Sequence, residues 1–94
     1  MTIEVLGPVS TLCLGKPATV DAVSYALSEA GILGATLYPA TGLWRGDHEP
    51  SVVVVIAGLT ESAARNLAAR LAYVFSQECV YLAWGTADAV MVTP

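Results

Sequence analysis

The chain has 94 residues and a net charge of −4, with 55% hydrophobic and 13% charged residues. A chain this short builds a single core, so we expect one domain over residues 1–94. The hydrophobic content excludes a disordered chain. Lys16 is the only lysine of an acidic chain, which excludes a general binder of nucleic-acid backbones.

The first half of the sequence predicts two successive strands, a helix and a third strand. The β-rich stretch 2–14 is interrupted at Gly7-Pro8, which predicts a short strand before the break and a better one over 9–14. Thr19 is a predicted helix N-cap, and Gly31 ends that helix. A strand is predicted over 35–44, followed by a polar turn over 45–50.

The second half begins with the strongest strand of the chain, 51–57, which holds four consecutive valines. Thr60 is predicted to cap a second helix, in which Glu61 and Arg65 are spaced as an ion pair. Strands are then predicted over 79–84 and 89–93, and the tight-turn residues 85–88 between them favour a hairpin.

The resulting order, β–α–β–β–α–β with one additional strand at each end, predicts an α+β fold of the ferredoxin-like split β-α-β type. Two helices would cover one face of an antiparallel sheet. A sheet with one wet face alternates apolar and polar residues, but the run 52–56 is apolar at every position. We therefore expect the second face to pack against another subunit, which makes the protein its own partner in a homodimer or larger ring.

Three of the twelve charged residues, and the only histidine, fall in one short segment. Arg45, Asp47, His48 and Glu49 lie together in a chain that is poor in charge, and Tyr38 and Trp44 precede them. Such a loop is suited to binding a polar ligand or a partner protein. The alternative is an ordinary exposed turn, where polar residues carry no function. Arg70 and Tyr73, on the outer side of the second helix, are candidates for a partner surface, against the alternative of a solvated helix side.

The sequence supplies little for metal or covalent chemistry. His48 is the only histidine and both cysteines are remote from it, so we predict no metal site and no cofactor. Cys13 and Cys79 are expected to be buried thiols on strands, with a disulfide as the alternative. No nucleophile, base and oxyanion site occur together, which points away from an enzyme. Phosphate-binding glycine loops are absent from the sequence.

Two segments resemble a group of small, largely uncharacterised proteins encoded by bacteriophages and mobile elements, especially of actinobacteria. They are Tyr38-Pro-Ala-Thr-Gly-Leu-Trp-Arg-Gly-Asp-His-Glu-Pro-Ser-Val-Val-Val-Val-Ile and Phe75-Ser-Gln-Glu-Cys-Val. The resemblance covers about half of the chain. It singles out as a structural motif Gly42, Trp44, Gly46, Glu49, Ser51, Gln77 and Glu78. Gln77 and Glu78 would satisfy backbone groups near the end of the second helix.

These observations predict a non-enzymatic, oligomeric, phage-type accessory protein that binds a host protein or a small ligand. No apolar run is long enough to span a membrane and no secretion leader is visible, so the expected place is the cytoplasm, that of the host cell if a phage encodes the chain. The alternative is a small dimeric ferredoxin-like enzyme with a pocket near His48 and Tyr38. A third reading is a ligand-sequestering protein with sites at subunit seams, lined by Arg45, Arg70, Tyr73 and Trp84.

Overall fold

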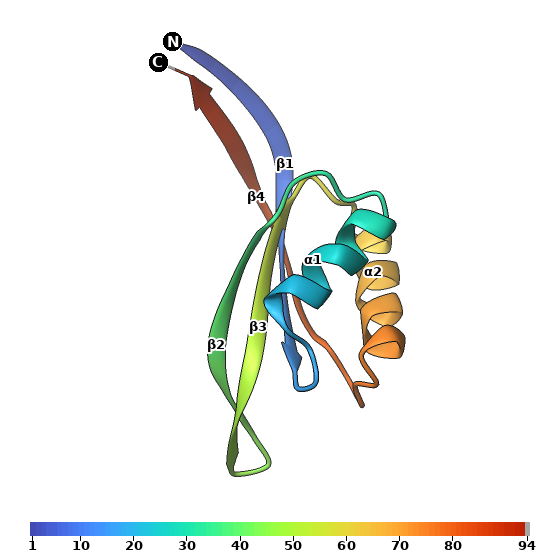
Figure 1. Ribbon diagram of the computed structural model, residues 1–94. Helices are drawn as coiled ribbons and strands as arrows, with labels where there is room; N and C mark the ends of the chain where they lie inside the picture. Colours follow the sequence, from blue (N-terminus) through green and yellow to red (C-terminus); the bar gives the residue numbers. More distant parts are fainter. Residues whose placement is uncertain (94) are drawn as a thin grey trace.

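The protein is an α+β structure in which two helices lie on one face of a four-stranded antiparallel sheet (Figure 1). The computed structural model describes residues 1–93, with side chains described over 1–85 and at Val92. The sheet has the strand order β2-β3-β1-β4, which is consistent with the ferredoxin-like type. The elements in chain order are β1 (Thr2–Gly15), α1 (Val20–Glu29), β2 (Thr36–Trp44), β3 (Asp47–Ala57), α2 (Glu61–Val74) and β4 (Tyr81–Thr93).

Both helices begin where the sequence predicts. The Thr19 hydroxyl accepts a hydrogen bond from the Ala22 amide at 3.2 Å, and the Thr60 hydroxyl accepts one from the Ala63 amide at 3.1 Å. Each cap satisfies an amide that has no partner inside its helix. Within the described residues, neither helix has the length and apolar character that crossing a membrane requires.

The core lies between the helices and one face of the sheet. Alternate residues of the central strands are buried there, among them Leu12, Leu14, Val52, Val54 and Ile56. The helices contribute Val23, Leu27, Leu67 and Leu71 to the same cluster. This alternation is what a strand produces when only one of its faces is covered.

The opposite side of the sheet, here called the uncovered face, has no helix on it. Val53 and Val55 lie on it and are half-buried in the single chain. The predicted burial of this second side depends on another subunit. Paired residues share a face of a sheet, so the register defines its members. They are Val9, Thr11, Cys13, Gly15, Thr36, Tyr38, Ala40, Gly42, Trp44, Asp47, Glu49, Ser51, Val53, Val55, Ala57, Tyr81 and Ala83.

The predicted additional terminal strands are not separate strands. β1 continues through Gly7-Pro8, because Gly7 adopts a positive φ of 93° at an irregularity in the pairing with β4. The predicted hairpin of 79–84 with 89–93 is wrong, because β4 is one continuous strand and both parts pair with β1. The residues expected to turn, 85–88, are accommodated where the β1–β4 register shifts between Pro8 and Ser10.

The β2–β3 connection is shorter than the predicted polar turn over 45–50. Arg45 and Gly46 both have positive φ, of 50° and 85°, which is the backbone of a tight two-residue hairpin turn. The polar residues 47–50 instead extend β3 past the end of the core, where their side chains are exposed or half-buried.

Two substitutions in α2 test the assignment of its buried side. Leu71 is 1% exposed and Tyr73 is 88% exposed. We expect Leu71→Ala to lower the free energy of unfolding by about 3 kcal/mol, because it leaves a cavity in the core. Tyr73→Ala should change it by less than about 0.5 kcal/mol. Urea titrations followed by circular dichroism measure both, and equal losses would contradict this packing.

Candidate functional site

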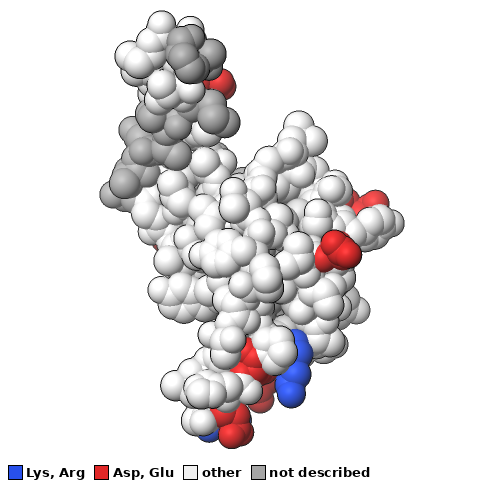
Figure 2. All heavy atoms as spheres, turned by 60° about the vertical axis from the view of Figure 1, so that its left-hand side comes forward, with Lys and Arg blue, Asp and Glu red and all other residues white. Residues whose placement is uncertain are grey.

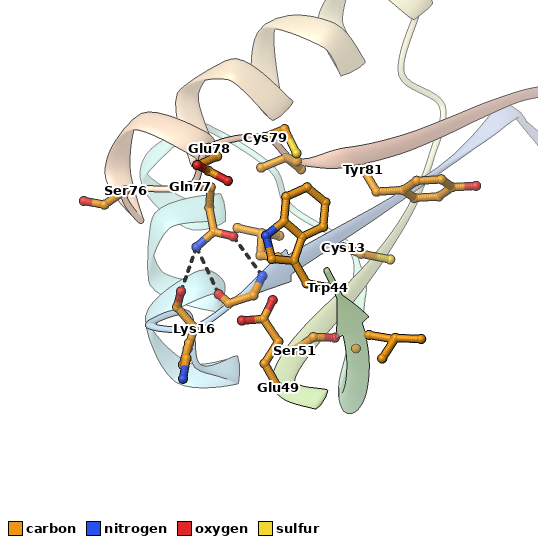
Figure 3. A pocket seen from close by; sticks show the side chains of 15 residues that line it. Cys13, Lys16, Trp44, Glu49, Ser51, Ser76, Gln77, Glu78, Cys79 and Tyr81 are labelled. Carbon is orange, nitrogen blue, oxygen red and sulfur yellow. Dashed lines mark hydrogen bonds between the residues drawn. The ribbon is translucent and has the colours of Figure 1, made fainter. Parts of the chain in front are cut away.

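A hollow of about 560 Å³ opens at one end of the uncovered face (Figure 3). It forms where neighbouring strands carry small residues: Ser51 of β3 pairs with Gly15 of β1, and Gly42 of β2 pairs with Glu49. Larger side chains surround these positions, with Trp44 from β2 and Tyr81 from β4. The segment 76–80, between α2 and β4, forms the remaining wall.

Gln77 connects that wall to the end of β1. Its Oε1 accepts a hydrogen bond from the Gly15 amide at 2.8 Å, and its Nε2 donates to the carbonyl oxygen of Gly15 at 3.1 Å (Figure 3). Nε2 also lies 3.1 Å from the carbonyl oxygens of Lys16 and Phe75, so its two hydrogens are shared among these acceptors. The Gln77 amide is thus committed to backbone groups and acts as a structural tie.

Arg45 and Glu78 form a second, weaker link across the same wall. The Arg45 guanidinium lies 3.2 Å from a Glu78 carboxylate oxygen and stacks 5.2 Å from the centre of the Trp44 ring. Both charged side chains are largely exposed, so the ion pair contributes little to stability. The pair spans from the β2–β3 turn to the segment that follows α2.

Glu49 places a carboxylate inside the hollow. Its side chain lies against Gly15 so closely that a Cβ at that position would overlap the carboxylate. Among the described side chains, none donates a hydrogen bond to this carboxylate and none forms an ion pair with it. Glu49 is half-buried, so its charge is available to a ligand that enters the hollow.

Both cysteines line the hollow, and neither forms a disulfide. Burial raises the pKa of the Cys13 thiol above its ordinary value. Cys79 is exposed and precedes β4, so the prediction that both thiols are buried on strands is wrong for Cys79. Cys79 lies outside the strand because β4 begins only at Tyr81.

The structure divides the residues that the sequence singled out. Those lining the hollow are Gly42, Trp44, Glu49, Ser51, Gln77 and Glu78, and Arg45 contacts two of them. Gly46 lies in the turn. His48 points to the opposite face from Glu49 because neighbouring strand residues alternate. The residues that do not line the hollow are Tyr38, Asp47, His48, Arg70 and Tyr73.

Sequence reasoning missed Cys13, Gly15, Lys16, Cys79 and Tyr81 as members of this site. Only Gly15 and Lys16 had a signal in the sequence, because Gly15-Lys16-Pro17 marks the end of a strand. Cys79 and Tyr81 had none. No group of three or more potential metal ligands is found within the described residues.

No protein-family model matches the chain, and no curated protein matches it. It is similar in structure to a phage SAM lyase. That structure, solved in the apo state, has a TM-score of 0.71 and 21% identity, and the match covers 93% of this chain and 90% of that chain.

At this identity the likeness shows the fold, and it links the chain to a phage protein. It also corrects the functional expectation from the sequence. A non-enzymatic binding protein was predicted because no catalytic constellation was visible, yet the fold shared over nearly the whole chain serves an enzyme in the neighbour.

The role of Gln77 as a tie has a direct test in stability. Gln77→Ala removes the hydrogen bonds to Gly15, Lys16 and Phe75, so we expect the free energy of unfolding to fall by about 2–3 kcal/mol. The neighbouring Glu78→Ala removes only an exposed ion pair and should cost less than about 0.5 kcal/mol. Urea titrations of both variants measure the difference, and a Gln77→Ala loss as small as that of Glu78→Ala would rule out the tie.

The two thiols should differ in reactivity. The raised pKa of Cys13 leaves less thiolate at pH 7.5, so iodoacetamide should alkylate Cys79 first. Raising the pH to 9.5 should accelerate Cys13, because more of its thiol then loses its proton. Timed alkylation with peptide mass spectrometry measures both rates, and Cys79→Ser isolates the slow one. Equal rates at pH 7.5 would contradict the assignment.

Proposed function

We propose that this protein is an enzyme that binds S-adenosylmethionine in the hollow and cleaves it as a lyase, without adding water. The observation that carries the proposal is the full-length structural likeness to a phage SAM lyase, together with the hollow at the end of the sheet. The volume of about 560 Å³ lies within the range of roughly 300–1,000 Å³ that small-molecule sites occupy.

The residues of the hollow suit the charges of this substrate. S-adenosylmethionine carries a sulfonium cation, an ammonium group and a carboxylate. Trp44 and Tyr81 offer aromatic rings, which attract cations through their electron-rich faces. The Glu49 carboxylate, which has no ionic partner among the described side chains, is assigned to the substrate ammonium. In this arrangement the aromatic side chains contact the sulfonium.

The proposed reaction breaks a carbon–sulfur bond of the sulfonium. A carboxylate oxygen of the substrate forms a bond to the γ-carbon of its own methionine chain as the bond from that carbon to sulfur breaks. The bonding electron pair stays on sulfur, so the products are a neutral thioether and a lactone, and no atom is added or lost. Positive charge on sulfur decreases as the bond breaks. The attraction of the aromatic rings for the sulfonium therefore contributes to substrate binding, and the rate depends on how the hollow orients the attacking oxygen toward the carbon bound to sulfur.

The finer description of fold and setting is also part of this proposal. The order β2-β3-β1-β4 and the β–α–β–β–α–β succession support a ferredoxin-like fold. The phage neighbour and the resemblance of the two segments support a phage origin. Action in the host cytoplasm follows from the substrate, which cells use there, and agrees with the two free thiols.

The experiment that tests the function incubates purified protein with S-adenosylmethionine and follows the thioether product by liquid chromatography and mass spectrometry. We expect cleavage by the wild type. Glu49→Gln should lower kcat/KM by about 10- to 100-fold, because the charge that holds the substrate ammonium is lost. Asp47→Asn is the matched control. It removes a carboxylate two residues away on the same strand and outside the hollow, and should leave the rate unchanged.

Gly15→Ala provides an independent variant of the same site. Its Cβ would displace the Glu49 carboxylate, whose flexible side chain can move aside, so the protein should fold while its rate falls as in Glu49→Gln. No cleavage by folded wild-type protein would refute the proposal. Equal rates of wild type, Glu49→Gln and Gly15→Ala would remove Glu49 from it.

A further inference from the structure

Two thiols from distant parts of the chain line the hollow. Cys13 lies on β1, and Cys79 lies in the segment 76–80 that leads into β4. They form no disulfide, and neither takes part in the reaction proposed above. Cysteine thiolates are strong nucleophiles, so a hollow that binds an electrophile brings thiol and electrophile together. Which thiol reacts depends on how each is held and how far it is exposed.

A helix-capping motif directs the chain from α2 toward Cys79. Ser76 has a positive φ of 53°, and its amide donates a hydrogen bond to the Tyr73 carbonyl oxygen at 3.3 Å. The Gln77 amide donates to the Ala72 carbonyl oxygen at 2.8 Å, which completes a Schellman motif. The Gln77 side chain then joins this segment to the end of β1. Cys79 follows two residues later, so its backbone is anchored at the wall of the hollow.

Cys79 is the exposed thiol of the two, and it lies at the aromatic part of the hollow. Its sulfur lies toward the Trp44 ring in Figure 3, and Tyr81 comes two residues later at the start of β4. These two rings are the proposed contacts of the substrate sulfonium. Cys13 is half-buried, and its raised pKa keeps it protonated at neutral pH. Cys79 is thus the thiol suited to attack a bound sulfonium.

Charged side chains favour binding of a polar substrate at this end of the molecule. In Figure 2 the charged residues on the side shown lie chiefly at the lower end, around the β2–β3 turn, and the body above them is largely uncharged. Glu78, next to Cys79 in the chain, pairs with Arg45. Glu49 has no ionic partner among the described side chains and is the proposed contact of the substrate ammonium. A substrate held by Glu49 therefore shares the hollow with the Cys79 thiol.

We propose that Cys79 is a site of covalent modification by the protein's own sulfonium substrate. The inference rests on the proposed function. In a small fraction of binding events the Cys79 thiolate attacks the γ-carbon before the substrate carboxylate does. A bond forms between the Cys79 sulfur and that carbon, the bond from the carbon to the sulfonium sulfur breaks, and its electron pair stays on that sulfur. The thiol proton goes to water. The products are the same neutral thioether and a chain that carries an aminocarboxypropyl group on Cys79.

Orientation decides how often this modification occurs. The carboxylate belongs to the same molecule as the carbon that it attacks, so it outcompetes a thiol held by the protein in most turnovers. A cysteine thiol is only a few per cent thiolate at neutral pH, which lowers its share further. The attached group brings an ammonium and a carboxylate into the hollow and occupies the place of the substrate. The modification therefore accumulates with turnover and ends the activity of each chain that receives it.

Mass spectrometry of the intact chain during turnover tests the proposal. Wild-type protein is incubated with S-adenosylmethionine, and chain mass and cleavage are followed in the same samples. We expect the mass to rise by about 101 Da, because the aminocarboxypropyl group replaces the thiol proton, and activity to fall in proportion. Peptide mapping should place the group on Cys79. The chain unfolded in guanidinium chloride, whose thiols are not oriented toward the substrate, should be modified at least about 10-fold more slowly.

Three variants separate this modification from ordinary thiol reactivity. Cys79→Ser should lose the mass increase and keep a larger share of its own initial rate after the same number of turnovers. Cys13→Ser is the matched control and should still gain about 101 Da on Cys79. At substrate concentrations below KM, Glu49→Gln should gain it at least about 10-fold more slowly than the wild type, because the substrate occupies the hollow less often. Its Cys79 should react with iodoacetamide within about twofold of the wild-type rate.

The outcomes distinguish the modification from the function on which it rests. Cleavage of an about 1,000-fold excess of substrate with Cys79 unmodified would refute the modification and leave the lyase. An adduct on Cys79 without cleavage would support the modification and refute the lyase, and the absence of both would refute both. A gain of about 14 Da, which is a methyl group, would overturn attack at the γ-carbon. So would an adduct that hydroxylamine releases, since that adduct is a thioester formed from the lactone.

Discussion

The hydrogen bonds of the Gln77 side chain with the Gly15 backbone are the constraint on which the candidate site depends. They join the end of β1 to the segment that leaves α2, two parts of the chain that are 62 residues apart. A backbone donor and acceptor at a strand end would otherwise be left to water. By satisfying both, Gln77 holds the wall 76–80 beside the floor made by Gly15, Gly42 and Ser51. The hollow is therefore a product of tertiary structure, since its parts come from three distant stretches of sequence.

The sequence alone predicted correctly the elements that depend on interactions between residues close together in the chain. Thr19 and Thr60 marked both helix starts, and apolar spacing marked the buried sides, because caps and periodicity act within a few residues. The hairpin expected around 85–88 failed for the opposite reason. Those residues favour a turn locally, but pairing with β1 on both sides of them keeps β4 a single strand. Long-range pairing overrides turn preference, and nothing in a single sequence reports that register.

The candidate site likewise combines residues that the sequence could single out with residues that only strand pairing brings together. The unusual density of charge over Arg45–Glu49 directed attention to a region that borders the hollow, because Trp44 and Glu49 line it. Strand alternation then separates that cluster: Glu49 faces the hollow and His48 the opposite side. The contributions of Cys13 and Tyr81 depend on the pairing of β1 with β4, which places them in adjacent positions. The absence of side chains at Gly15 and Gly42 is what makes the hollow, and a glycine in a sequence does not reveal what it leaves room for.

The sequence predicts no combination of nucleophile, base and oxyanion site. An enzyme needs such a combination when it must activate its substrate. A sulfonium is already activated, because its carbon–sulfur bond breaks to release a neutral thioether. For such a substrate the protein needs mainly to orient the reacting groups. The proposed function therefore accounts for a chain with 13% charged residues and a single histidine that lies outside the hollow. Poverty in reactive side chains, which first suggested a binding protein, is compatible with catalysis when the substrate carries its own leaving group.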